Sequence, residues 1–429
     1  MGLWLLHKYG ELQCKQKIIL MLMGTFILRL PLAIYHLIYW PKSFGPDLDP
    51  ILMTLIEPYS DYDYYYKLFA QVFVSGLWTP YSGLVNHSWL SSYLYPPLFL
   101  YILSIPALIS PELVFFPLFI ADVGLPILIY LFLKEKSEKM AIWGYIVTCC
   151  CPFLIFYDGG LFLNTSLVLL ALIVSLYFFY YEKYKTAVFT MALAFLIKQV
   201  ILFFIPPLFC YAVLKSSNGS KKSYLKQFAI LGVILIGTIG IGSLPWILLT
   251  PTNYISAVFM GQAPTLTPDL QPRLLTWPLH WYSFLIDLRV PAEIIYVVGF
   301  LTFTMLGLLI TELFSIILLI RWHRRRVLDW VRILDIIIFI AILSHLFLPR
   351  GVYKYYFTLH IPLITLWIAF HYQASLETAR GRKRWGGIVV GLSSLALIFP
   401  RQIYLLLIWL IFILIMWTDF KKHSTMVEN

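Results

Sequence analysis

Two aspartates and four tyrosines stand close together just after the first long apolar run of this chain. Asp61 and Asp63 open the stretch "DYDYYYKLFAQVFV", of which residues 62–74 suit an amphipathic helix lying along a membrane surface. Carboxylates at the start of a helix are favoured by the helix dipole, so one interpretation is capping, with Asp63 paired to Lys67 one turn on. The other is chemical, because a carboxylate partly removed from water becomes more basic and suits general-base work.

Isolated charges elsewhere lie in apolar or aromatic surroundings. Lys198 is inside the apolar run 186–214, where a charge without a partner is costly, and Asp158 is a candidate partner for it. Arg350 and Lys354 flank the stretch "GVY", and Lys354 is equally well placed to extend its amine toward water among the tyrosines. Charges of this kind are where a functional site in a membrane protein is expected.

Tryptophan and histidine side chains form a further group of candidates. Trp277 and His280, in the segment 250–290, suit stacking or hydrogen bonding to a ligand, and so does His345 near the end of an apolar run. Each has an ordinary alternative. The tryptophan belongs equally well to an interfacial aromatic belt, and the histidines to local hydrogen bonds.

The composition places these residues in a membrane protein. Hydrophobic residues make up 60% of the chain and charged residues only 12%, about half the share that a soluble domain carries. Long continuous apolar runs predict spanning helices rather than the short alternating strands of a barrel. The net charge of +11 is explained by cytoplasmic loops rich in Lys and Arg, so we predict no nucleic-acid partner. Neither a P-loop nor a dinucleotide fingerprint is present in the sequence.

The distribution of positive charge predicts a topology. Two interpretations of the apolar runs are needed for this. The proline-containing run 93–110 lies in the interface or re-enters, and the run 186–214 enters and leaves on one side, broken near its lysine and its two adjacent prolines. Most Lys and Arg residues then fall in cytoplasmic segments. The chain then makes about twelve crossings, with both termini in the cytoplasm and the first span retained. We predict a single membrane domain over 1–429, with extracytoplasmic loops at 41–92 and 250–290.

The order of these motifs resembles a known family. Asp61-x-Asp63-Tyr is followed by Gly76, by "PY" and by "YLYPPL". This is similar to the first lumenal loop of the membrane-embedded C-type glycosyltransferases that use a polyprenyl-phosphate sugar as donor. The resemblance is closest to the branch that contains the first GPI mannosyltransferase and the polyprenol-phosphate-mannose-dependent mannosyltransferases.

The resemblance covers roughly residues 60–210. "FYDGGLFLN" is similar to the second lumenal segment of the family, and "LAFLIKQVILFFIPP" to its lysine-centred segment before a proline. The chain departs from the family at Asn164, where an acidic residue is common. The C-terminal half matches only loosely, through "LPRGVYKYYFTLHIPL".

The resemblance implies an all-α polytopic fold, a GT-C-like bundle, and a reaction on the extracytoplasmic face. A sugar, mannose in the resembled branch, is transferred from a dolichyl- or polyprenyl-phosphate donor to an acceptor hydroxyl, expected on a glycolipid, with inversion. A departing lipid phosphate monoester needs no cofactor, so we predict no obligatory metal. A Mn²⁺ or Mg²⁺ ion held by Asp61 and Asp63 stays open.

The resemblance also implies roles for the candidate residues. Asp63 is the expected general base and Asp61 its close alternative, since the resemblance covers both. The expected donor-phosphate ligands are Lys198, Arg350 and Lys354, because Arg offers a planar fork and Lys a point charge. Contacts to the acceptor or the sugar are expected from Asp158, Asn164, Trp277 and His280.

Two other functions compete with this one. A transporter or lipid flippase would use intramembrane charges and broken helices along a transport path. A non-catalytic subunit of a glycosyltransferase complex would keep the fold without the base, and a small membrane subunit is itself a compatible partner. We expect a prokaryotic plasma membrane rather than an endoplasmic reticulum, because the C-terminal pattern of the eukaryotic enzymes is poorly matched.

Overall fold

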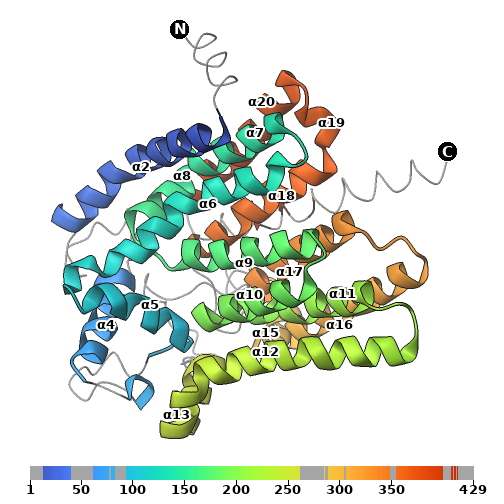
Figure 1. Cartoon of the computed structure of the whole chain (residues 1–429), viewed down its shortest axis with the longest axis horizontal. Coiled ribbons are helices and arrows are strands. Elements are labelled where there is room, and N and C mark those ends of the chain that lie inside the picture. The colour runs from blue at the N-terminus through green and yellow to red at the C-terminus, as the bar shows by residue number, and fades with distance from the viewer. Residues whose placement is uncertain are drawn as a thin grey trace.

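Most of the described part of the chain is helical. The computed structural model describes residues 13–39, 61–76, 79–82, 93–260, 285, 288–303, 306–347, 354–399, 407, 408, 410, 411 and 413. Within these residues the secondary structure consists of α-, 3₁₀- and π-helices, without a strand (Figure 1). The prediction of an all-α protein is therefore confirmed for the described part of the chain.

The α-helices in the first half of the chain are α2 (Cys14–Tyr39), α4 (Lys67–Val74), α5 (Pro97–Ala107), α6 (Phe116–Lys134), α7 (Glu138–Cys149), α8 (Pro152–Leu154), α9 (Thr165–Tyr180), α10 (Tyr184–Ile197) and α11 (Ile205–Ser216). Those that follow are α12 (Lys221–Leu249), α13 (Pro251–Ile255), α15 (Ala292–Phe303), α16 (Leu306–Arg324), α17 (Trp330–Phe347), α18 (His360–His371), α19 (Gln373–Leu376) and α20 (Ala379–Ile398). The π-helices are η1 (Tyr62–Tyr66), η4 (Ile155–Gly160) and η6 (Ser256–Met260), and the 3₁₀-helices are η2 (Pro80–Ser82), η3 (Pro111–Phe115), η5 (Gln199–Phe203) and η7 (Lys354–Leu359).

Several of these helices are long and apolar enough to cross a membrane. Among the described residues there are 4: Cys14–Ile38, Pro111–Lys134, Lys221–Leu249 and Leu306–Arg324. A bent pair, Glu138–Cys149 with Pro152–Gly160, raises the number to 5 if it counts as one span. The chain is thus an all-α membrane protein. The predicted twelve crossings are not confirmed, because prolines, π-turns and 3₁₀-turns divide many of the apolar runs into helices shorter than a membrane span.

The predicted break in the run 186–214 is confirmed. The helix α10 ends at Ile197, and Lys198 has an extended backbone with φ −151° and ψ 130°. A 3₁₀ turn follows, and α11 then begins with Pro206 and Pro207 in its first turn, where the missing N–H of proline breaks no helical hydrogen bond. The break places Lys198 at the end of a helix, with its side chain inside the protein.

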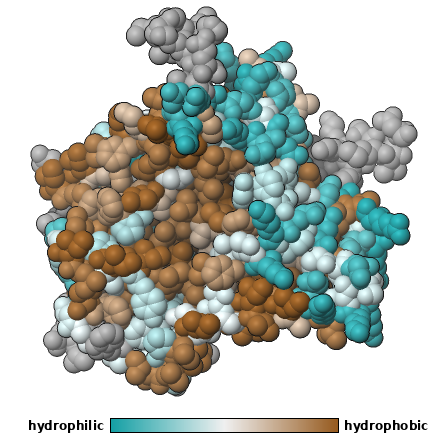
Figure 2. All heavy atoms as spheres, in the orientation of Figure 1, coloured by the Kyte–Doolittle hydropathy of each residue, from teal (hydrophilic) through white to brown (hydrophobic). Residues whose placement is uncertain are grey.

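One edge of the molecule is polar. In Figure 1 the connections from α11 to α12 and from α16 to α17 lie at the right-hand edge, and α19 lies at the upper right. In the same orientation, Figure 2 shows hydrophilic residues gathered along this edge and hydrophobic residues over the centre and left. Apolar helix surfaces that end in a polar rim are what a bilayer requires of a protein that crosses it.

The helix predicted after the two aspartates is present, and one of its faces packs against protein. The π-helix η1 runs directly into α4, and Tyr62, Tyr65, Tyr66 and Phe69 are buried along one side. Their spacing of three and four residues is that of one helix face. This face packs against the aromatic residues that precede and begin α5. The tyrosines therefore fill a protein core, and the predicted position of this helix along a membrane surface stays a prediction.

Candidate functional site

The Asp61 carboxylate is held by two tyrosines. Its Oδ2 accepts hydrogen bonds from the hydroxyls of Tyr95, at 3.1 Å, and Tyr66, at 3.3 Å. Asp61 stands at the N-cap of η1, yet its side chain makes no capping hydrogen bond to the turn that follows. The predicted position at the start of the helix is confirmed, but the carboxylate makes no capping hydrogen bond and points toward the tyrosines of the first loop and of the segment before α5.

The π-turn is what allows Asp61 and Tyr66 to meet. A π-helix accommodates an extra residue per turn and so re-aims the side chains on either side of it, which is why such turns occur often at functional sites. Burial raises the pKa of Tyr66 well above its ordinary value, and the nearby Tyr95 and Asp61 add to this. Tyr66 thus remains a neutral hydroxyl that donates to the carboxylate.

The backbone of Asp63 lies within η1, but its side chain is outside the described residues. Its predicted role as the base stays a prediction. The predicted capping pair between Asp63 and Lys67 has a competitor, because the Lys67 amine lies 2.5 Å from the Glu112 carboxylate in η3. Lys67 thereby joins α4 to the start of the next apolar segment.

The segment "YLYPPL" connects the acid to the broken helix. Tyr95 precedes two prolines that begin α5, and its carbonyl accepts a hydrogen bond of 2.9 Å from the hydroxyl of Tyr81. The side-chain amide of Gln199 donates to the carbonyl of Leu94 at 3.1 Å. These contacts dock η5 onto the segment that carries Tyr95. The ring of Tyr95 consequently lies 6.0 Å from the Nζ atom of Lys198.

The Lys198 amine lies among an amide and three aromatic rings. It donates a hydrogen bond of 2.8 Å to Oδ1 of Asn164, and its side chain is buried. The rings of Tyr356 and Tyr355 lie 5.1 Å and 5.9 Å from its Nζ atom, so cation–π attraction adds to the hydrogen bond. A buried lysine was expected to need a partner. Asn164 is a hydrogen-bonding partner, whereas the predicted partner Asp158 interacts with Lys198 electrostatically, without a hydrogen bond to its oxygens among the described residues.

Asp158 lies deeper, in the π-helix η4. Its side chain is fully buried, and neither carboxylate oxygen has a hydrogen-bond partner among the described residues. The charged groups that act on it are Asp122, Lys198 and Arg29. A buried carboxylate with both oxygens unmatched is rare in proteins and points to a bound hydroxyl, amide or water.

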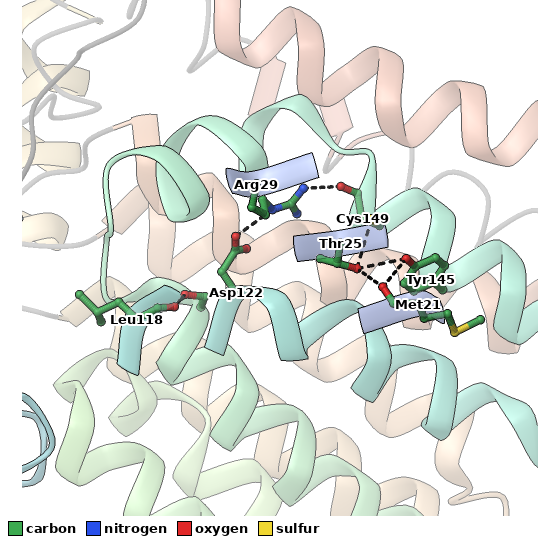
Figure 3. A network of polar contacts seen from close by, with 8 residues as sticks. Met21, Thr25, Arg29, Leu118, Asp122, Tyr145 and Cys149 are labelled. Carbon is green, nitrogen blue, oxygen red and sulfur yellow. Dashed lines mark hydrogen bonds and ion pairs between the residues drawn. The ribbon is translucent and has the colours of Figure 1, made fainter. Parts of the chain in front are cut away.

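Arg29 and Asp122 form a buried ion pair that sequence reasoning missed (Figure 3). The Nε atom of Arg29 in α2 donates to Oδ2 of Asp122 in α6 at 2.8 Å, and Nη1 donates to the carbonyl of Cys149 at 2.5 Å. The sequence does indicate such a pair, because an arginine and an aspartate in separate apolar helices are each energetically costly without a partner. Arg29 had no predicted role.

A hydrogen-bonded cluster extends this ion pair along α2. The Thr25 hydroxyl donates to the carbonyl of Met21 at 2.9 Å and lies 3.1 Å from the hydroxyl of Tyr145, as Figure 3 shows. Together with Arg29 these contacts fix α2 against α6 and α7. The pair also touches η4 directly, since a Cβ atom at Gly159 would lie 2.6 Å from Cδ of Arg29 and 2.8 Å from Oδ2 of Asp122.

Of the candidate residues in the C-terminal half of the chain, only Lys354 and His345 lie among the described residues. The Lys354 amine is buried and donates to the carbonyls of Leu397, at 2.7 Å, and Phe399, at 2.8 Å, where it satisfies backbone groups at the end of α20. This geometry gives no support to its predicted role as a phosphate ligand. His345 is buried with its ring 4.8 Å from that of His360. The other three, Arg350, Trp277 and His280, lie outside the described residues.

The described residues thus assemble a connected polar site. Asp61 is hydrogen-bonded to its two tyrosines, Lys198 is hydrogen-bonded to Asn164, and Asp158 interacts electrostatically with Lys198 and with the ion pair of Arg29 and Asp122. Such an arrangement offers a carboxylate that can accept a proton and a cation that can balance a developing negative charge. Among the described residues, no group of three or more His, Cys, Asp and Glu side chains is arranged to hold a metal ion.

Neither a protein-family model nor a curated protein sequence matches this chain.

Proposed function

We propose that this chain is an inverting membrane glycosyltransferase that transfers a sugar from a polyprenyl- or dolichyl-phosphate donor to a hydroxyl group of a glycolipid. The observation that carries the proposal is the position of Tyr95. Its hydroxyl donates to the Asp61 carboxylate, and its ring contacts the Lys198 ammonium group. An acid and a cation from distant parts of the chain are therefore neighbours, as proton removal and phosphate departure both require.

The reaction follows from these two groups. The acceptor hydroxyl attacks the anomeric carbon while Asp61 or Asp63 takes its proton, and the bond from that carbon to the phosphate oxygen breaks. The electron pair leaves with the lipid phosphate monoester. Its charge is balanced by Lys198, with Arg350 as the second proposed cation. Because attack and departure occur on opposite faces of the carbon, the configuration inverts.

Asp158 and Asn164 suit the sugar. The two carboxylate oxygens of Asp158 and the amide nitrogen of Asn164 are buried and lack hydrogen-bond partners among the described residues. Sugar hydroxyls supply both donors and acceptors, and a site built to bind them leaves such groups unmatched when it is empty. Mannose is the first sugar to test. We do not include Lys354 among the phosphate ligands, because backbone carbonyls hold its amine.

Transfer can be measured directly. The purified chain is incubated with polyprenyl-phosphate mannose and a membrane lipid extract, and new glycolipids are detected by mass spectrometry. We expect both Asp61→Asn and Asp63→Asn to lower the rate of transfer, and the substitution that removes the general base to abolish transfer. Glu293→Gln, at an exposed acidic residue, should leave the rate unchanged. Undiminished transfer in both aspartate variants would overturn the assignment of the base.

A transporter or flippase is the second candidate, favoured by the charges buried in membrane helices at Arg29, Asp122 and Asp158. Reconstituted liposomes separate the two functions. Lipid or solute movement without any new glycolipid would favour transport, and transfer without movement would favour the enzyme. If transfer appears only after a second membrane protein is added and survives both aspartate substitutions, the chain is a non-catalytic subunit.

A further inference from the structure

A cluster of cations at one edge of the molecule lies away from the proposed catalytic groups. Exposed lysines at the start of α12 and exposed arginines at the end of α16 come together there. We call this the basic patch and define it by six residues, Lys221, Lys222, Lys226, Arg324, Arg325 and Arg326. The connections that carry it lie at the right-hand edge of Figure 1, where Figure 2 shows hydrophilic residues.

Direct contacts bring the two halves of the patch together. The hydroxyl of Tyr224 in α12 and Nε2 of His323 in α16 are joined by a hydrogen bond of 2.7 Å. The helix α11 packs against both α12 and α16. Lys215 at the end of α11 lies near enough to His323 for their charges to interact, so it adds a further cation beside the patch.

Among the described residues, few acidic side chains lie near the patch. Asp329 follows α16 closely in the chain, but its Oδ1 atom already accepts a hydrogen bond of 2.9 Å from the backbone N–H of Arg332. Glu182 lies in the connection between α9 and α10, and both it and Asp329 act electrostatically on Tyr211. Two acids cannot balance six cations and Lys215, so the described residues of this region carry a strong excess of positive charge.

Apolar helix surface begins directly beside the patch. On α12, Leu225 and Phe228 are 71% and 57% exposed and lie within two turns of Lys221. Both α12 and α16 are long and apolar enough to cross a membrane. Trp322 of α16 is partly buried beneath the guanidinium of Arg332, 5.1 Å from its ring, as is common for tryptophan at a membrane boundary.

We propose that the basic patch binds the headgroups of anionic phospholipids. A lipid lying along α12 would place its phosphate beside Lys221 and Lys222 and its acyl chains against Leu225 and Phe228. This combination of a dense cation cluster and an adjoining apolar surface distinguishes a lipid from a soluble anion, which needs only the cations. Clusters of four to eight cations next to a membrane helix bind anionic lipids in this way.

Native mass spectrometry of the purified full chain tests the proposal. The chain is titrated in detergent with phosphatidylglycerol or phosphatidylcholine, and retained lipids are counted. We compare a patch variant, Lys221→Gln with Arg325→Gln and Arg326→Gln, with a control that removes the same charge from α20, Arg380→Gln with Lys383→Gln and Arg384→Gln. Each cation near an anionic surface strengthens binding by roughly fivefold, so the patch variant should bind phosphatidylglycerol on the order of a hundredfold more weakly.

The control variant should keep most of the phosphatidylglycerol binding, and phosphatidylcholine should bind weakly to all three proteins. Equal loss in the two variants would overturn the proposal, because it would mean that only net charge matters. In a separate experiment, inorganic phosphate is added as a competitor of phosphatidylglycerol. If it displaces phosphatidylglycerol at equal concentration, the patch recognises an anion without its acyl chains, and the proposed lipid site is wrong. Circular dichroism confirms that each variant remains helical.

Discussion

Tyr95 is the residue on which the geometry of the candidate site depends most. Its hydroxyl donates to the Asp61 carboxylate while its ring lies 6.0 Å from the Lys198 amine, so one side chain lies next to both charges to which we assign roles in the proposed reaction. The sequence predicted the acid and the cation separately, from their cost in apolar surroundings. It did not predict Tyr95 as the connection between them, because a tyrosine near a membrane span has many ordinary roles.

Replacing Tyr95 by phenylalanine should change how transfer depends on pH. The ionised form of Asp61 loses a hydrogen-bond donor and is stabilised less, so the acidic limb of the pH–rate profile should move to higher pH by about one unit if Asp61 is the base. Tyr93→Phe is the matched control, since the buried Tyr93 hydroxyl has no hydrogen-bond partner among the described residues. Transfer assayed across pH decides the matter. An unmoved limb in Tyr95→Phe would show that Asp61 is not the titrating group.

The pair formed by Arg29 and Asp122 should matter more for stability than for chemistry. Arg29→Met leaves a buried aspartate without its cation, which destabilises a protein by about 3–5 kcal/mol. The double variant that also carries Asp122→Leu should recover most of this loss, because neither charge remains. Thermal unfolding in detergent measures the stability of the single and the double variant.

Lys17→Met is the control for this prediction. Its ion pair with Glu138 lies at a partly exposed position, with side chains 13% and 37% exposed, so its loss should cost about 1 kcal/mol or less. If Arg29→Met unfolds at a temperature no lower than this control does, the buried ion pair contributes little to the stability of the fold.

At the scale of the elements, some features could be predicted and others could not. The break near Lys198 followed from two prolines and a charge in one apolar run, which are local signals. The π-turns of η1 and η4 have no such local signal, since they arise from the way neighbouring helices pack. The pairing of Arg29 with Asp122 is equally non-local, because nothing in either segment specifies which helix it will face.

The π-helix η4 depends on Gly159. A methyl group there would meet Cδ of Arg29 at 2.6 Å and the Asp122 carboxylate at 2.8 Å. Because both atoms belong to a buried ion pair, Gly159→Ala should push η4 away from α2, lower stability by about 1–3 kcal/mol and reduce transfer by displacing Asp158.

Gly237→Ala in α12 is the matched control, since a Cβ atom there would meet nothing within 4 Å. Alanine favours a helix over glycine by about 1 kcal/mol, so this variant should be neutral or more stable. The two variants are compared by their thermal unfolding curves and by their rates of transfer. Equal stability would mean that η4 tolerates displacement.

At the scale of the whole molecule, composition was enough to predict an all-α membrane protein, because the shortage of charge leaves few other options. The number of crossings was not predictable in the same way. Hydropathy counts apolar runs, whereas the structure folds several of them into short or bent helices within the protein. The predicted orientation rests only on the distribution of Lys and Arg along the sequence, and the polar edge in Figure 2 does not by itself say which side it faces.

Alkaline phosphatase fusions at the two ends of α12 test the orientation. This helix of 29 residues is long enough to span, and the end that leads into α13 lies beside the candidate site, since the rings of Tyr254 and Tyr81 are 4.9 Å apart. A fusion after Thr252 should be active, because that end is predicted to be extracytoplasmic, and a fusion after Asn218 should be inactive. The reverse result would place Asp61 and Lys198 on the cytoplasmic face. The positive-inside prediction would then fail, and so would the proposed extracytoplasmic site of transfer.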